Sequence, residues 1–123
     1  MDLLTADIRR QLPPLYAREG VEDPMVCARF FTPWTNWTWY PIEFDGEDLF
    51  FGLVDGHEVE LGYFSLAELE SVIGPGGLRI ERDLHFRPTS LSEVRREIAR
   101  RDSWKIAETP PLPYSHHQRE RGR

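Results

Sequence analysis

The sequence predicts an α+β fold, with a twisted antiparallel sheet of four to five strands arranged as a meander and about three helices. Two observations favour this class. Segments rich in β-forming residues follow one another from Met25 to Tyr63, separated by short turns. Two segments with helical periodicity come next, and both begin with a capping box, SLAE at residues 65–68 and SLSE at residues 90–93. Strands followed by capped helices are typical of α+β domains.

The expected strands are bounded by residues that favour turns, and Asp55-Gly56 is a strong hairpin signal. In the segment after it, acidic residues alternate with apolar ones, so Leu61 and Tyr63 are expected to face the core. Residues 78–86 also alternate and are the candidate for a fifth strand. The other four strands are expected at residues 25–32, 37–44, 49–54 and 58–63.

The aromatic strand at residues 37–44 is the centre of this pattern. Successive side chains of a strand point to opposite faces, so one apolar face is expected to hold Thr38, Tyr40, Ile42 and Phe44. Trp37 and Trp39 fall on the other face, where they are either covered or form an exposed aromatic platform. Pro41 has no N–H to donate, which indicates an edge strand or a bulge.

Three helices are expected, at residues 3–12, 66–73 and 91–101. Thr5 is the N-cap of the first, and each of the other two begins after a capping Ser. The second should present Leu66, Leu69, Val72 and Ile73 on one face, and the third Leu91, Val94 and Ile98. Residues 1–107 are interpreted as a single α+β domain, and residues 108–123 as a flexible tail rich in Pro, His and Arg.

Charge is unevenly distributed over the 123 residues, whose net charge is −6. Residues 1–86 hold 6 Arg and 16 acidic residues, giving −10, while residues 87–123 hold 9 basic and 5 acidic residues, giving +4. Cys27 is the single cysteine, so it is expected to be a buried thiol, and no internal disulfide forms. No apolar run is long enough for a membrane span and no signal peptide is recognisable, so we expect a cytoplasmic protein.

Several blocks in fixed order carry a resemblance to one protein family. Among them are FTPW at residues 31–34, WTWY at residues 37–40, FGLVDG at residues 51–56 and ERDLHF at residues 81–86. Together with ELGYFSLAEL at residues 60–69, they resemble domain-of-unknown-function family 2958, over about residues 3–97. The resemblance implies a small bacterial protein of the kind often carried by plasmids and other mobile elements, and it implies no particular activity.

Two clusters have acid–base potential. One contains His57, Glu58 and Glu60, and the other runs from Glu81 to His85 and contains Glu81, Asp83 and His85. If their strands were neighbours, Glu58, Glu60, Glu81, Asp83 and His85 could share a face, and with His57 they are weak candidates for a metal site or for general acid–base groups. The favoured interpretation is solvated charge on exposed strands and turns, and no cofactor is expected.

Arg82 differs from the other charged residues, because the alternation places it on the apolar side with Ile80 and Leu84. A partly buried arginine needs a carboxylate. A structural ion pair is therefore the favoured interpretation, and an anion-binding Arg82 is the alternative.

The sequence is consistent with three classes of function. The favoured one is a non-enzymatic protein-binding module, for which imitation of nucleic-acid charge against a host protein is one form. Its contact residues are expected to be Trp34, Trp37, Trp39, Glu58, Glu60 and Arg82. The second is a nucleic-acid binder in which Trp37 and Trp39 stack on bases and the basic tail contacts phosphates, although the acidic body opposes this. The third is a metal-dependent enzyme that uses the two acidic clusters.

Because the tail is polar and rich in proline, truncation after Ala107 is expected to change the melting midpoint little. Thermal unfolding followed by circular dichroism measures this. A large drop in the midpoint would show that the tail docks on the domain, with residues 111–114 as the segment to test first.

Overall fold

The computed structural model describes residues 2–108, with side chains as far as Ser103. The described chain divides after Leu91 into two units, of which the first contains both sheets and the second contains all of helix α3 except its first residue. The elements in order are α1 (Ala6–Gln11), β1 (Met25–Val26), β2 (Phe30–Phe31), β3 (Thr38–Phe44), β4 (Leu49–Asp55), β5 (Val59–Ser65), α2 (Leu66–Ser71), the 3-10 turn η1 (Pro75–Gly77), β6 (Glu81–Arg82), β7 (Thr89–Ser90) and α3 (Leu91–Glu108).

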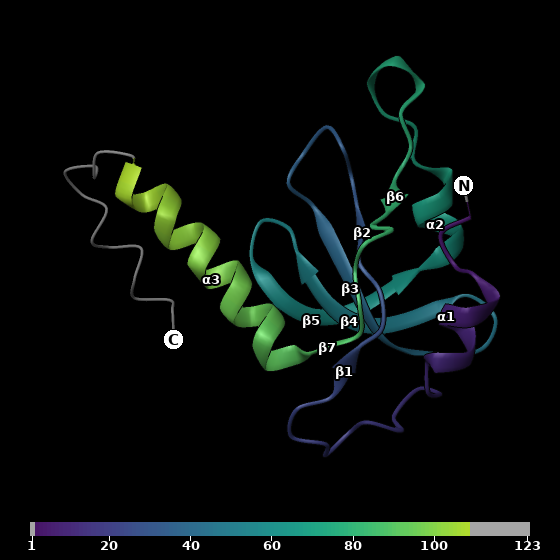
Figure 1. The fold of residues 1–123 in the computed structure, drawn as a ribbon. Coiled ribbons are helices and arrows are strands. Elements are labelled where there is room, and N and C mark those ends of the chain that lie inside the picture. The colour runs from purple at the N-terminus through teal and green to yellow at the C-terminus, as the bar shows by residue number, and fades with distance from the viewer. Residues whose placement is uncertain (1, 109–123) are drawn as a thin grey trace. The chain divides into compact units, whose positions relative to one another are not determined.

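The larger sheet has five strands in the order β5-β4-β3-β2-β6, and all its pairs are antiparallel. Strands β2 to β5 are neighbours in the order in which they occur along the chain, as a meander requires (Figure 1). The small second sheet pairs β1 with β7. The predicted α+β class, with an antiparallel sheet and three α-helices, is therefore confirmed.

The strand expected at residues 25–32 is in fact two short strands in different sheets. Met25–Val26 pairs with β7, whereas Phe30–Phe31 pairs with β3 and β6. Between them the Cys27 N–H donates to the Pro41 carbonyl at 2.9 Å. The segment does form extended β structure, but its first part is hydrogen-bonded to β7 and its last part to β3 and β6.

A bulge in β3 changes which face its side chains occupy. Trp39 pairs with Val54 and Phe44 pairs with Phe50, and the register shifts between Pro41 and Glu43. Because Val54 and Phe50 are four residues apart in β4, Trp39 and Phe44 lie on the same face of the sheet. The expectation that Phe44 shares a face with Thr38 and Tyr40 was therefore wrong, while the bulge suggested by Pro41 is present.

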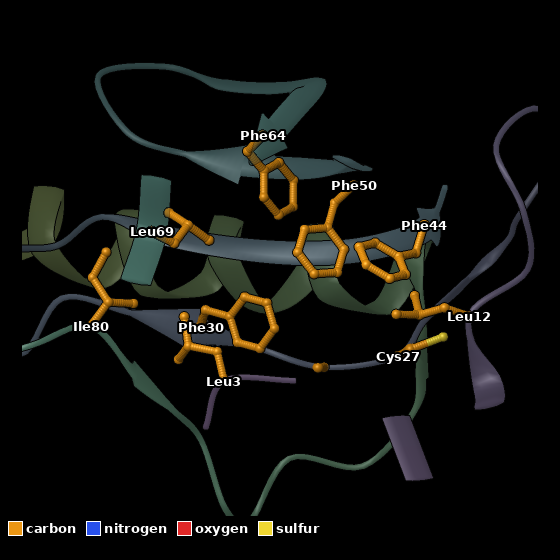
Figure 2. Close-up of a cluster of buried hydrophobic side chains, with 10 residues drawn as sticks. Leu3, Leu12, Cys27, Phe30, Phe44, Phe50, Phe64, Leu69 and Ile80 are labelled. Atoms are coloured by element: carbon orange, nitrogen blue, oxygen red, sulfur yellow. The ribbon is translucent and has the colours of Figure 1, made fainter. Parts of the chain in front are cut away.

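The main core lies on the face that holds Trp39 and Phe44. Its centre is aromatic, since Phe50 packs against Phe30, Phe44 and Phe64 with ring centroids 5.8, 4.6 and 5.3 Å away (Figure 2). Leu3 and Leu12, which flank α1, and Leu69 of α2 belong to the same cluster. The cluster comprises Leu3, Leu12, Cys27, Ala28, Phe30, Phe44, Phe50, Phe64, Leu69 and Ile80.

Strand β5 corrects the predicted alternation. Phe64 pairs with Phe50 and is buried in the core, whereas Leu61 and Tyr63 are 43% and 51% exposed. Leu61 and Tyr63 lie on the opposite face from Phe64 because they are an odd number of residues away from it. They are exposed because β5 is the last strand of the sheet and no further strand covers them in the part of the chain that the structure describes.

Glu43 is buried on that opposite face, at 4% exposure, and it fixes a loop. Its two carboxylate oxygens accept hydrogen bonds from the Tyr16 and Arg18 N–H groups, at 2.8 and 2.7 Å. Tyr16 has a φ of +70°, a conformation that is costly for a non-glycine residue. The two charge-assisted bonds hold the backbone in it.

The helix caps were predicted well and the helix ends less well. Thr5 accepts from the Ile8 N–H, and Ser65 accepts from the Glu68 N–H. Helix α2 ends at Ser71, so Ile73, expected on its buried face, is 64% exposed. Helix α3 extends past the predicted end at Arg101, because no proline or glycine interrupts the chain before residue 110.

The fifth strand is shorter than residues 78–86, since β6 contains only Glu81 and Arg82. The Asp83 side chain accepts from the His85 N–H at 2.9 Å, and this turn ends the strand. Leu84, expected on the apolar side, is exposed. The predicted tail at residues 108–123 lies, except for Glu108, outside the described residues.

Substitutions at two paired glycines test how closely β3 approaches β4 at the bulge. Gly52 and Gly62 face each other across β4 and β5. A Cβ at Gly52 would lie 2.1 Å from the Tyr40 carbonyl oxygen, whereas a Cβ at Gly62 would meet nothing within 4 Å. We expect Gly52→Ala to lower the free energy of unfolding by about 2 kcal/mol. Gly62→Ala, the matched control, should leave it unchanged or raise it by up to about 1 kcal/mol. Urea unfolding measures both, and equal effects would contradict the close approach.

Candidate functional site

The two acidic clusters lie at opposite edges of the five-stranded sheet. His57, Glu58 and Glu60 belong to the β4–β5 hairpin, whereas Asp83 and His85 follow β6. Three strands separate β5 from β6, so the condition under which the clusters would share a face is not met. Within residues 2–103, no three His, Cys, Asp or Glu side chains come together in a way that could hold a metal ion.

The three tryptophans expected at a binding surface are all partly buried. Trp39 packs against the core cluster. Trp34 and Trp37 each lie against a glycine, because a Cβ would be 2.6 Å from the Trp34 ring at Gly74 and 2.4 Å from the Trp37 ring at Gly56. Gly56 therefore does more than make the turn that the sequence predicts, since its missing side chain leaves room for an indole.

Trp37 is the centre of a small aromatic group. Its ring centroid is 5.9 Å from that of Trp39 and 5.3 Å from that of His57, with the imidazole nearly perpendicular to the indole. The group connects the start of β3 to the tip of the β4–β5 hairpin. It fixes the position of Trp37 beside the first residues of β5.

An open hollow of ≈ 300 Å³ lies next to this aromatic group. Trp37 and Val54 give it apolar lining, and Glu58 and Glu60, both exposed, add two carboxylates. Among the residues that the structure describes, neither carboxylate has an ion-pair partner. An aromatic face beside two carboxylates is suited to a cationic side chain, which gains from both. The lining residues are Trp37, Val54, Gly56, His57, Glu58 and Glu60.

A second hollow, also of ≈ 300 Å³, lies at the opposite edge of the sheet, and charged side chains that line it already have partners within the chain. Arg29 pairs with Asp83 at 3.3 Å and lies over the Phe31 ring at 5.0 Å. Arg82 donates to the carbonyl oxygens of Asp2 and Leu3, at 3.1 Å for Leu3. Arg82 thus tethers the N-terminal segment to β6, far in the strand order from Trp37 and Glu60.

Cys27 is buried, and its thiol donates to the Gln11 carbonyl oxygen over 3.7 Å. Burial raises the pKa of the thiol, while the charge of Arg18 opposes that rise. A thiol with a raised pKa stays protonated at neutral pH and is a poor nucleophile.

Sequence reasoning missed a pair of tyrosines beside β5. Tyr16 and Tyr63 are both exposed, and their hydrogen bond raises the pKa of the Tyr63 phenol. Tyr63 also packs on Phe51, with ring centroids 5.1 Å apart. No pattern in the sequence connects residues so far apart, because the link depends on the Glu43 carboxylate that anchors the Tyr16 loop.

No helix among the described residues has the length and apolar character needed to cross a membrane. Comparison with curated proteins finds no match, and comparison with solved structures finds none either. A family model does match, over residues 3–104, and its description is a protein of unknown function, DUF2958. Because the match covers most of the chain, this protein belongs to the DUF2958 family.

Proposed function

We propose that this protein is a non-enzymatic, cytoplasmic protein-binding module of a bacterial mobile element, and that it binds a basic segment of its partner. The observation that carries the proposal is the hollow that Trp37, Glu58 and Glu60 line together. These three residues are among those expected at a partner surface, and their common position in one hollow supports the proposal.

The chemistry of the hollow favours a lysine or arginine side chain as its occupant. An indole face attracts a cation, and the attraction is worth about 0.5–2 kcal/mol depending on desolvation. Glu58 and Glu60 add charge-assisted hydrogen bonds, which are stronger than neutral ones. Aromatic residues commonly supply most of the binding energy at protein interfaces, while surrounding charges set the association rate and selectivity.

The charge of the whole chain points in the same direction. Residues 1–86 carry −10, so they attract basic surfaces over a distance and repel phosphate backbones. A host protein that binds nucleic acid has a basic binding surface, and an acidic module that imitates the charge of DNA would occupy it. This supports the host-directed role over direct binding of nucleic acid.

The positions of the tryptophans also favour a protein partner. A base-stacking platform needs open aromatic faces. Trp39 packs on the core cluster, Trp37 lies on the Gly56 turn, and Trp34 lies on Gly74. Indoles packed in this way suit the anchoring of a single partner side chain better than the stacking of a row of bases.

Binding of DNA is therefore expected to be weak. Labelled single- and double-stranded oligonucleotides should show no submicromolar affinity at an ionic strength of about 0.15 M, where the Debye length is about 8 Å. Fluorescence anisotropy measures this. Submicromolar binding that survives this salt and is lost in Trp37→Ala would replace the protein partner with a stacked nucleic acid.

A fluorescently labelled oligo-arginine peptide is the direct probe of the hollow. We expect it to bind the full chain, and we expect Glu58→Lys with Glu60→Lys to weaken binding by about tenfold or more, equivalent to about 1.4 kcal/mol. The matched control is Glu47→Lys with Glu70→Lys, which makes the same change in net charge at two exposed residues outside the hollow. Equal losses in both double variants would show that only net charge matters and would contradict a local site.

A further inference from the structure

Strand β5 is the long open edge of the five-stranded sheet. Its seven residues pair with β4 in continuous register, from Leu49 with Ser65 to Asp55 with Val59, and no bulge interrupts them. In an antiparallel pair every second residue turns its N–H and C=O groups away from the neighbour. Among residues 2–108 no strand pairs with the other side of β5, so those groups form a ready template for another strand.

Proteins normally protect such an edge with prolines, charged side chains (above all lysine), bulges, a very short strand, or a covering helix or loop. Strand β5, whose sequence is VELGYFS, has no proline, lysine or bulge, and Glu60 is its one charged residue. The edge strand at the other side of the sheet, β6, has only two residues. Within residues 2–91, the sheet therefore has one edge that is only two residues long and one long edge that pairs with no strand.

The two faces of β5 differ in chemistry. Leu61 and Tyr63 are exposed on one face, and Tyr16 adds a further exposed ring there. Glu60 lies on the other face, because its pair partner Val54 is also the partner of Trp39. Glu60 also lines the hollow that holds Trp37 and Glu58. A strand added to this edge would place apolar side chains beside Leu61 and Tyr63, and basic ones beside Glu60.

We infer that β5 accepts an extended segment of the partner protein as a sixth strand, with basic and apolar residues in alternation. This inference rests on the proposed function and names how the partner binds. Charge complementarity decides the occupant: pairing of two copies would bring together two bodies whose residues 1–86 each carry −10, whereas a basic segment neutralises Glu58 and Glu60. The main-chain hydrogen bonds supply affinity and the alternate side chains supply selectivity, as in other cases of strand addition.

The test compares two labelled peptides with the same alternating arginine and valine side chains. One has an ordinary backbone and the other is N-methylated at every amide, so it keeps its charge but cannot donate along either edge. We expect the ordinary peptide to bind the full chain and the methylated peptide to bind at least about tenfold more weakly. Amide exchange of residues 59–65 should slow on binding the ordinary peptide, because N–H groups that faced water become paired.

The outcomes separate the inference from the proposed function. Equal binding of the two peptides, with Glu58→Lys and Glu60→Lys weakening both, would overturn strand addition and leave a hollow that binds cations. Failure of both peptides to bind would overturn strand addition and the proposed function together. A dimer of the free chain, seen by sedimentation and protecting residues 59–65 from exchange, would overturn the basic partner in favour of a second copy.

Discussion

The bulge between Pro41 and Glu43 is the constraint on which the rest of the sheet depends. It turns Phe44 into the core beside Phe50 and turns Glu43 to the opposite face. Without the extra residue, strict alternation would place the Glu43 carboxylate on the face of Trp39 and the aromatic core, where an unpaired charge is very costly. With it, the carboxylate meets two backbone N–H groups and one large ring fills the core.

The same bulge shapes the hairpin that carries the candidate site. The Tyr40 carbonyl comes so close to β4 that only glycine fits at position 52. Strands β4 and β5 then continue in regular register to the Gly56 turn, where the Trp37 ring lies on the backbone. The loop held by Glu43 brings Tyr16 to Tyr63. The hollow and the tyrosine pair therefore lie at the two ends of β5, and both depend on how β3 is bent.

The features that could be predicted from the sequence are those that depend on neighbouring residues along the chain. Thr5 and Ser65 cap helices, and Asp55-Gly56 closes a hairpin, because each acts on residues only a few positions away. The wrong predictions concern side chains whose burial is determined by residues far away in the sequence. The position of Phe44 depends on the bulge, and the exposure of Leu61 depends on β5 being an edge strand. The sequence made Trp37, Glu58 and Glu60 candidates for a site. It could not show that Asp83 lies far from them, because that separation follows from the order of the strands in the sheet.

Asp48, in the turn between β3 and β4, has a consequence for the order of folding. Its carboxylate accepts hydrogen bonds from the Ser65 hydroxyl at 2.6 Å and from the Ala67 N–H at 2.8 Å, and its carbonyl accepts from the Leu66 N–H. These groups meet only after β4 and β5 have paired, since Leu49 is the pairing partner of Ser65. A six-residue helix has no stability alone. We therefore expect helix α2 to form on the completed hairpin, after β4 has closed on β5.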